Sequence, residues 1–237
     1  MTQTQHMYKE NAKSLNWFVG CNHDCVYCKP SFQRQMKRQK KRCLKCYNYE
    51  PHAHLEKLSK PPPKVMEKEF VFFPSSGDVA FAPKEAVQQA MDYARKYSDH
   101  TFLIQSKDPE CFIDYDIPKN VIVGTTIETN QTCFYTPSKY RYYAWISTAI
   151  LPEKRFISMT RLTSVRQEVT IEPILDFDLS ILTKWIYRIN PEFIYIGYDN
   201  HNCKLPEPKL AYTQRLIDVL SEDFEVRVKT LRKAWYE

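Results

Sequence analysis

The amino-acid sequence predicts an α/β fold in which parallel strands alternate with helices. Seven short runs of β-branched and aromatic residues are spread over the chain, and each run is continuous, as in strands that are buried on both faces. Helical patterns separate several of the runs, and this alternation implies right-handed crossovers between parallel strands. Both an open doubly wound sheet and an incomplete barrel fit the pattern. The runs lie at residues 15–19, 70–73, 101–105, 121–123, 168–171, 193–196 and 225–228.

Three segments show the apolar periodicity of helices that pack on such a sheet. Residues 83–97 begin with a proline in the first turn, where its fixed φ suits a helix. Residues 179–189 and 208–220 repeat apolar side chains at the same spacing. Residues 155–159 fit a strand and a helix equally well.

Length and composition place the chain among folded globular proteins. Its 237 residues can bury one sizeable core, so we expect a single domain over residues 1–237. Hydrophobic residues make up 43% and charged residues 26%, which excludes disordered, collagen-like and coiled-coil chains. No apolar run approaches the roughly 20 residues of a membrane span, and the first residues do not form a secretion signal. We therefore expect a cytoplasmic protein without a membrane partner.

The cysteines are distributed unevenly along the chain. Five of the eight fall within residues 21–46, and in a reducing compartment such spacing indicates metal more often than disulfides. Three of them, Cys21, Cys25 and Cys28, form the pattern C-x3-C-x2-C, with Tyr27 before the last. Thiolates hold all four irons of a cluster that only carries electrons. Three thiolates would leave one iron open to a ligand, like the open position of a catalytic metal site.

Polar residues follow directly after several predicted strands. The chain has only four glycines, and each closes an apolar run, where the backbone can turn sharply or approach a ligand closely. Cofactors of parallel α/β folds lie at the carboxyl ends of the strands, so residues there are expected to face a cofactor and substrate. An Asp or Glu in this position can also simply cap a turn. The candidates are Ser76, Gly77, Asp78, Thr126, Glu128, Glu172 and Tyr198. Lys107, Lys229 and Arg232 could meet a carboxylate or a phosphate, but we interpret them as solvated surface.

The segment from Cys21 to Cys28 resembles the signature of the radical S-adenosylmethionine (SAM) superfamily. In that superfamily the cysteine loop, with an aromatic residue before the third cysteine, follows the first strand of a partial barrel. Over most of its length the chain is most similar to the branch near spore photoproduct lyase and to phage- and archaea-associated members without assigned reactions. The similarity is carried by residues 17–29, 72–78, 124–130, 169–177, 197–200 and 228–233.

The resemblance implies a partial (β/α)6-type parallel barrel, rather than an open sheet, with a cysteine-rich insertion after the first strand. It implies a [4Fe-4S] cluster on Cys21, Cys25 and Cys28 whose open iron binds SAM. One electron from a flavodoxin- or ferredoxin-type donor would then cleave SAM, giving a 5'-deoxyadenosyl radical that abstracts hydrogen from an unknown substrate. A closed site that recruits Cys43 or Cys46 as a fourth ligand is the alternative.

The resemblance also implies roles at the SAM end of the site. Backbone carbonyls around Ser76 and Gly77 would hold the amino group of SAM, and Asp78 stands where the superfamily usually has Glu. Tyr27 is the aromatic residue of the signature, and we expect it beside the cofactor.

Further candidates come from the later strands. Thr126 and Glu128 correspond to residues that bind the ribose hydroxyls or the methionyl carboxylate in the superfamily, and Glu172 has the matching place after the fifth strand. Because they are expected near strand ends, Tyr198 or Cys133 would return a hydrogen atom after the chemistry.

Residues 29–64 form the predicted insertion, which carries a second group of metal ligands. Two thiolates and two imidazoles are ligands that zinc prefers, and they are supplied by Cys43, Cys46, His52 and His54. We interpret the group as a structural zinc site. A second iron-sulfur cluster, or free thiols with histidines that touch the substrate, are the alternatives.

The insertion also carries six positive charges in nine residues, 34–42, within a chain whose net charge is +6. Clustered Lys and Arg is typical of nucleic-acid binding, although a solvated helix face gives the same pattern. Aromatic residues crowd at 140–145, where they could stack on bases or simply pack. The rival to the enzyme is therefore a zinc-stabilised nucleic-acid-binding protein without redox catalysis.

Overall fold

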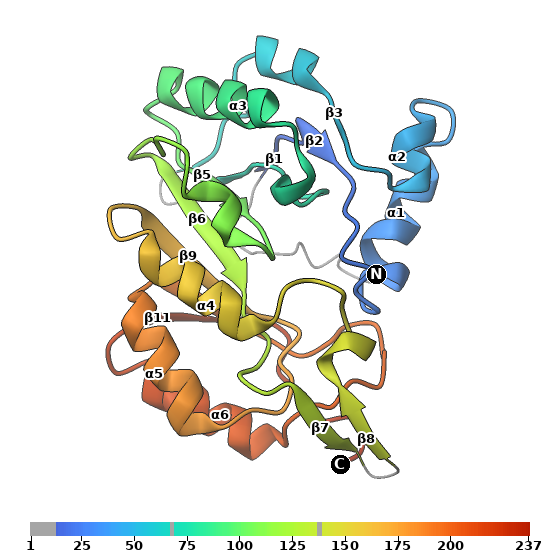
Figure 1. Ribbon diagram of the computed structural model, residues 1–237, viewed down its shortest axis with the longest axis vertical. Coiled ribbons are helices and arrows are strands. Elements are labelled where there is room, and N and C mark those ends of the chain that lie inside the picture. The colour runs from blue at the N-terminus through green and yellow to red at the C-terminus, as the bar shows by residue number, and fades with distance from the viewer. Residues whose placement is uncertain (1–12, 67–68, 137–138) are drawn as a thin grey trace.

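The structure of the protein, a computed structural model, describes residues 13–66, 69–136 and 139–237 (Figure 1). Its centre is a seven-stranded sheet in which all neighbouring strands run parallel. The strand order is β1-β4-β5-β6-β9-β10-β11, so each crossover leads to the next strand along the sheet. The strands are Lys13–Ser14 (β1), Val71–Phe72 (β4), Phe102–Gln105 (β5), Val121–Thr126 (β6), Arg166–Ile171 (β9), Phe193–Ile196 (β10) and Glu225–Val228 (β11).

This strand order distinguishes the two predicted architectures. A doubly wound sheet reverses its direction of growth at a switch point, whereas this sheet grows in one direction from β1 to β11. Within the described ranges the sheet curls without β1 pairing to β11. The predicted partial barrel is confirmed.

Four helices pack against one face of the sheet (Figure 1). The three predicted helices are confirmed, and residues 155–159 belong to a fourth. The longest helix has 13 residues, and none in the described part of the chain is long and apolar enough to cross a membrane. The helices are Lys84–Lys96 (α3), Pro152–Arg161 (α4), Leu179–Ile189 (α5) and Leu210–Leu220 (α6).

Alternate residues of each strand face either these helices or the opposite, inner face of the sheet. On β9, Val169 and Ile171 join the main core, which includes apolar residues of all four helices. The inner face carries a second apolar cluster, which explains why the runs are continuous rather than alternating. Its members are Phe70, Phe72, Leu103, Ile122, Phe193 and Tyr195.

The first predicted strand, residues 15–19, is only partly confirmed. The sheet contains Lys13–Ser14, while Phe18–Val19 (β2) pairs antiparallel with His52–Ala53 (β3) of the insertion. Asn16 explains the break. Its side-chain oxygen accepts the amide N–H groups of Ser75 over 2.7 Å and Ser76 over 3.1 Å. A side chain here makes the bonds that the backbone of an unbroken strand would make.

The remaining elements belong to the insertion and to a hairpin between β6 and α4. The insertion contains a π-helix at Lys29–Gln33 (η1), Arg34–Met36 (α1), Leu44–Asn48 (α2), and 3-10 helices at Lys37–Gln39 (η2) and Leu55–Ser59 (η3). The hairpin consists of Cys133–Thr136 (β7) and Lys139–Tyr142 (β8), followed by Tyr143–Trp145 (η6). Two further 3-10 helices follow β4 and β5, at Val79–Phe81 (η4) and Pro109–Phe112 (η5).

Candidate functional site

The cysteine loop, residues 20–28, is joined directly to the segment that follows β4. The amide N–H of Gly20 donates to the carbonyl of Ser76 over 3.0 Å, and the amide N–H of Asp78 donates to the carbonyl of Gly20 over 3.1 Å. Gly20 and Gly77 thus form an isolated parallel bridge beyond the end of β4. The predicted SAM motif and the cysteine loop therefore lie side by side at the carboxyl end of the sheet. The proposed contacts of its carbonyls with SAM stay a prediction.

The loop is held on its other side by residues 146–148, which follow η6. The amide N–H of Val26 donates to the carbonyl of Ile146 over 2.9 Å, and that of Thr148 donates to the carbonyl of His23 over 2.9 Å. The sulfur of Cys25 lies 3.1 Å from the hydroxyl of Ser147. Nothing in the sequence pointed to this segment, because it is more than a hundred residues away from the loop.

The three loop thiols share a partly buried, cationic environment. Cys25 is buried, and Cys21 and Cys28 are partly exposed. A hydrogen bond from Cys28 lowers the pKa of Cys25 to about 5 against the effect of burial, and the ammonium of Lys107 lowers it further. The thiolate is the form that binds a metal. The loop therefore favours an ionised ligand at Cys25.

The distances between potential ligand atoms show which residues could share a single metal ion. In the described part of the chain, two groups of three or more ligand atoms lie within 4.8 Å of one another, and neither contains two of the loop thiols. A four-iron cluster is larger than one ion and takes one thiolate per iron. The three cysteines stay the predicted cluster ligands, whereas Cys43, Cys46, His52 and His54 make one of the tight groups. All eight cysteines are free.

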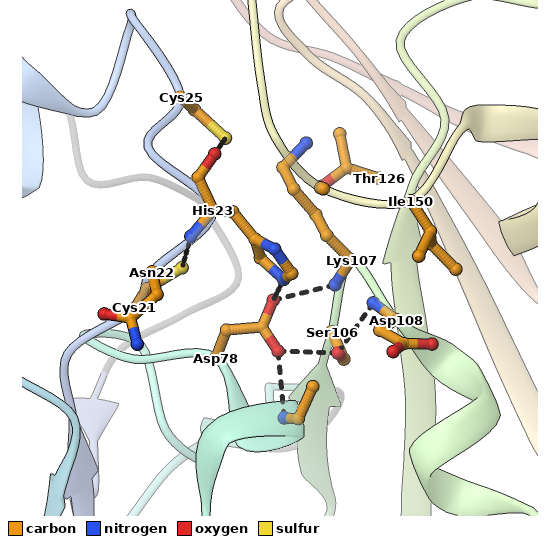
Figure 2. A network of polar contacts seen from close by, with 12 residues as sticks. Cys21, Asn22, His23, Cys25, Asp78, Ser106, Lys107, Asp108, Thr126 and Ile150 are labelled. Carbon is orange, nitrogen blue, oxygen red and sulfur yellow. Dashed lines mark hydrogen bonds and ion pairs between the residues drawn. The ribbon is translucent and has the colours of Figure 1, made fainter. Parts of the chain in front are cut away.

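The other tight group is Cys21, His23 and Asp78, and here the imidazole already has a partner (Figure 2). Nε2 of His23 lies 3.1 Å from a carboxylate oxygen of Asp78, and its ring packs on Phe81 with centroids 4.7 Å apart. Both groups are buried. His23 was not predicted as a site residue, although it lies inside the cysteine motif.

Asp78 ties three segments together. It accepts the hydroxyl of Ser106 over 2.6 Å, the amide N–H of Lys107 over 2.8 Å and the amide N–H of Ala80 over 3.0 Å (Figure 2). Burial raises the pKa of Asp78, but the bonds from His23 and the β5 end outweigh it and hold the pKa below its usual value. The side chain does cap η4, as the simpler interpretation expected, and it also connects β4 and β5 to the cysteine loop.

Glu128, which follows β6, is fully buried in a polar cluster next to the loop. The hydroxyl of Tyr27 donates to it over 2.6 Å and the hydroxyl of Tyr143 over 3.1 Å. The guanidinium of Arg155 donates over 2.8 Å, and the ammonium of Lys107 forms an ion pair with the same carboxylate. The structure thus brings together Tyr27 and Glu128, both predicted, with Lys107, Tyr143 and Arg155.

Two cations surround this one carboxylate. Burial raises the pKa of Glu128, but Lys107 and Arg155 outweigh it and lower the pKa to about 2. Lys107 has only 11% of its side chain exposed, so its interpretation as solvated surface was wrong. The two positive charges of Lys107 and Arg155 outnumber the single negative charge of Glu128. Lys107 lies close enough to the thiols to stabilise negative groups there.

The other predicted residues lie around this cluster or away from it. The carbonyl of Thr126 accepts a bond of 2.7 Å from Arg155. Glu172 is paired with Lys229, another lysine that is mostly buried rather than solvated. Arg232, about a third exposed, is likewise paired with a carboxylate, that of Glu207. Whether Thr126 and Glu172 contact SAM stays a prediction.

Tyr198 and Cys133 have different surroundings. The hydroxyl of Tyr198 lies 3.0 Å from the carbonyl of Pro208 and 2.7 Å from the hydroxyl of Thr213 on α6, so it points into the helical layer and not toward the loop. Cys133 begins β7, opposite Tyr142, and is partly exposed. Its hairpin adjoins the loop, whereas the structure does not bring Tyr198 to it.

One further acidic residue, Glu168, lies on the inner face of the sheet. It accepts bonds from Gln105 over 2.6 Å and from Thr170 over 2.5 Å, and burial raises its pKa to about 7. A side chain on Gly124 would overlap the carboxylate of Glu168, so the glycine provides its space. Sequence reasoning missed Glu168 because it lies within a strand rather than at its end.

The fold can be compared with known structures. No protein-family model and no curated protein sequence matches the chain. SuiB from Streptococcus suis bound to S-adenosylmethionine is similar, with a TM-score of 0.53 and 9% identity over 91% of this chain and 49% of SuiB. The chain therefore shares the partial-barrel fold of SuiB. SuiB bound to the precursor peptide SuiA gives a TM-score of 0.51 and 8% identity over 90% and 48% of the two chains, so this chain spans about half the length of SuiB.

The Glu128 cluster leads to a prediction about stability. We expect Glu128→Gln to lower the free energy of unfolding by about 3 to 5 kcal/mol at pH 7, because Lys107 and Arg155 lose their counter-charge. The wild-type contribution is present above the ordinary glutamate pKa of 4.5 and is lost as the pH falls toward about 2. Urea unfolding at neutral and acidic pH measures both effects.

The matched control is Glu192→Gln, which breaks the exposed ion pair with Arg166. It should cost less than about 1 kcal/mol. Equal losses in the two variants would show that the Glu128 cluster does not stabilise the fold.

Proposed function

We propose that the protein is a radical SAM enzyme. It reductively cleaves SAM at a [4Fe-4S] cluster held by Cys21, Cys25 and Cys28, and the resulting 5'-deoxyadenosyl radical abstracts a hydrogen atom from a substrate. The observation that carries the proposal is the three-thiol loop at the carboxyl end of a partial barrel, where cofactors of such folds lie. The similarity to a SAM-bound structure supports it.

The cluster, when bound, passes one electron from a flavodoxin- or ferredoxin-type donor to SAM, which splits into methionine and the radical. The chain's own residues prepare the site for this. The ammonium of Lys107 faces the thiols and is suited to the methionyl carboxylate, while Glu128 keeps that ammonium in place. Carbonyls at Ser76 and Gly77 are suited to the amino group, since a carbonyl oxygen has two lone pairs and the Gly20 amide occupies one at Ser76.

Glu128 changes its role in this proposal. Its two oxygens already accept bonds from four side chains, so a ribose hydroxyl would have to displace one of them. We therefore assign Glu128 as a positioning residue for Lys107 and Tyr27. Thr126 stays a candidate for a SAM contact, as does Glu172.

A zinc-stabilised nucleic-acid-binding protein without redox catalysis is less well supported. Such a module has no need of a partial barrel or of three thiols that stand apart from the tight four-ligand group. Free cysteines throughout fit a reducing, cytoplasmic compartment.

Iron content and SAM cleavage test the proposal. Protein purified without oxygen should carry about four irons per chain and release 5'-deoxyadenosine from SAM on reduction with dithionite. Cys25→Ser should lose the iron and the cleavage, and Cys203→Ser, outside the loop, should keep both. Wild-type protein that binds iron but does not cleave SAM would refute the activity.

His23 tests whether one iron is open. Its imidazole is the nearest alternative ligand, and its bond to Asp78 leads us to expect that it does not bind the cluster. We therefore expect His23→Gln to keep about four irons per chain and the SAM-induced change in the electron paramagnetic resonance spectrum. A loss of iron comparable to that of Cys25→Ser would indicate a closed site.

For the substrate we propose a single-stranded nucleic acid. Residues 25–49 contain no acidic residue, and the six basic residues of 34–42 are all exposed. Two of them, Lys37 and Lys40, also contact the ring of Tyr47. On the hairpin, Tyr135, Tyr140 and Tyr142 are 69, 70 and 67% exposed. Phosphates bind such cations, and bases stack on such rings. Both surfaces adjoin the cysteine loop, the first in sequence and the second through Val26 and Ile146.

Binding of a fluorescein-labelled DNA single strand, followed by anisotropy, tests this substrate class. Reversing the charge of Lys37, Arg38 and Lys41 to Glu should weaken binding at least about tenfold and reduce its salt dependence. The same reversal at Lys119, Lys154 and Lys184, also exposed, should change affinity by less than about threefold. Equal weakening would contradict a specific surface, and tighter binding of poly-glutamate than of DNA would indicate an acidic peptide instead.

A further inference from the structure

The ligand atoms of Cys43, Cys46, His52 and His54 converge on one point. Nε2 of His52 lies 3.4 Å from each of the two sulfurs, and Nε2 of His54 lies 3.2 Å from the sulfur of Cys46. The two Nε2 atoms are 2.9 Å apart. Bonds of about 2.0 to 2.3 Å place the ligands of a tetrahedral zinc ion roughly 3.3 to 3.8 Å apart. The distances from His52 to the sulfurs fall in this range and the two shorter distances lie just below it, so the four atoms are grouped closely enough to share one ion.

The local structure prepares these ligands. Cys43 caps the start of α2, and its sulfur accepts the amide N–H of Cys46 over 3.4 Å, so both thiols face the same side. His52 lies in β3 and His54 directly follows it, two residues further on, and this spacing points both rings one way. Because the other ring nitrogens contact Glu50 and Glu56, at 2.7 and 3.2 Å, both Nε2 atoms are left for a metal.

The donor set identifies the ion. Two thiolates and two imidazoles in tetrahedral arrangement are typical of structural zinc, and four protein ligands leave no position for a substrate. An iron-sulfur cluster would require more space between its ligands than this group has, with all four atoms within 4.8 Å of one another.

The ligands are attached directly to the strand that leads into the cysteine loop. His52 pairs with Val19 in the β2–β3 ribbon, and the amide N–H of His54 donates to the carbonyl of Trp17 over 2.6 Å. Between Cys46 and His52 the chain passes over Gly20, so closely that a side chain there would overlap the backbone of Glu50 and Pro51. Only Gly20 therefore separates Val19, the strand partner of His52, from Cys21.

We propose that this group binds one zinc ion, which clamps the insertion against the start of the cysteine loop and so fixes the place of Cys21. The zinc site itself is independent of the proposed function. Its effect on the cluster rests on that function. Zinc occupancy therefore controls how well the loop accepts iron, although the ion takes no part in the reaction.

Metal analysis of the full-length protein tests the site. Wild-type protein should contain one zinc per chain, and Cys46→Ser and His54→Ala should each lose it, while Cys203→Ser should keep it. Cobalt(II) in place of zinc should give the visible bands of tetrahedral cobalt with thiolate charge transfer. Wild-type protein without zinc would overturn the assignment. So would wild-type protein with clearly more than four irons per chain, if the additional iron is lost in Cys46→Ser.

Iron loading tests the clamp. After anaerobic reconstitution, His54→Ala should hold at most half of the wild-type iron, and Gly20→Ala should also lose iron while keeping its zinc, because its four ligands are intact. Normal iron content in the zinc-free protein would refute the clamp. Since His54→Ala could unfold, the wild-type protein treated with a zinc chelator before reconstitution provides the same comparison.

The outcomes separate this inference from the proposed function. Cys25→Ser should lose iron but keep one zinc per chain. A protein with zinc and no iron would leave the zinc site standing and refute the radical SAM activity. A protein that cleaves SAM without zinc would do the reverse.

Discussion

The site depends on one buried charge, the carboxylate of Glu128. Five segments far apart in the sequence send a side chain to it or lie beside it: the cysteine loop, the end of β5, the end of β6, η6 and α4. A buried carboxylate is costly alone, as are the buried ammonium of Lys107 and guanidinium of Arg155. Each is tolerable only when the others are in place, so the cluster also selects one arrangement of these segments.

The sequence predicted the sheet well because its strands are buried on both faces, although Gly124 lies within β6 and not at its end. It also predicted that Cys43, Cys46, His52 and His54 come together, since these residues are close in the chain. Partners from distant segments could not be predicted in this way. Ser147 and Arg155 have no local pattern that distinguishes them from ordinary surface residues, and only the packing of α4 and η6 makes them part of the site.

The orientation of Tyr198 follows from the alternation of side chains along a strand. Ile194 and Ile196 face the helices, so a residue two positions further on is expected to face them as well if the strand continues. The structure places Tyr198 there, with its hydroxyl on α6. The break at Asn16 is different, because its cause is a side chain that accepts bonds from a neighbouring strand, and no apolar pattern records that.

The chain has only four glycines, and at each of them atoms from another part of the chain lie where a side chain would be. The space that Gly20 leaves is taken by the Glu50 carbonyl, and the space at Gly124 by Glu168 and Gln105. The missing Cβ at each glycine therefore allows another part of the chain to pack directly against the backbone. Substitutions should therefore be tolerated at most positions of the fold but not at these glycines. Distant homologues are expected to keep them even where the rest of the sequence has changed.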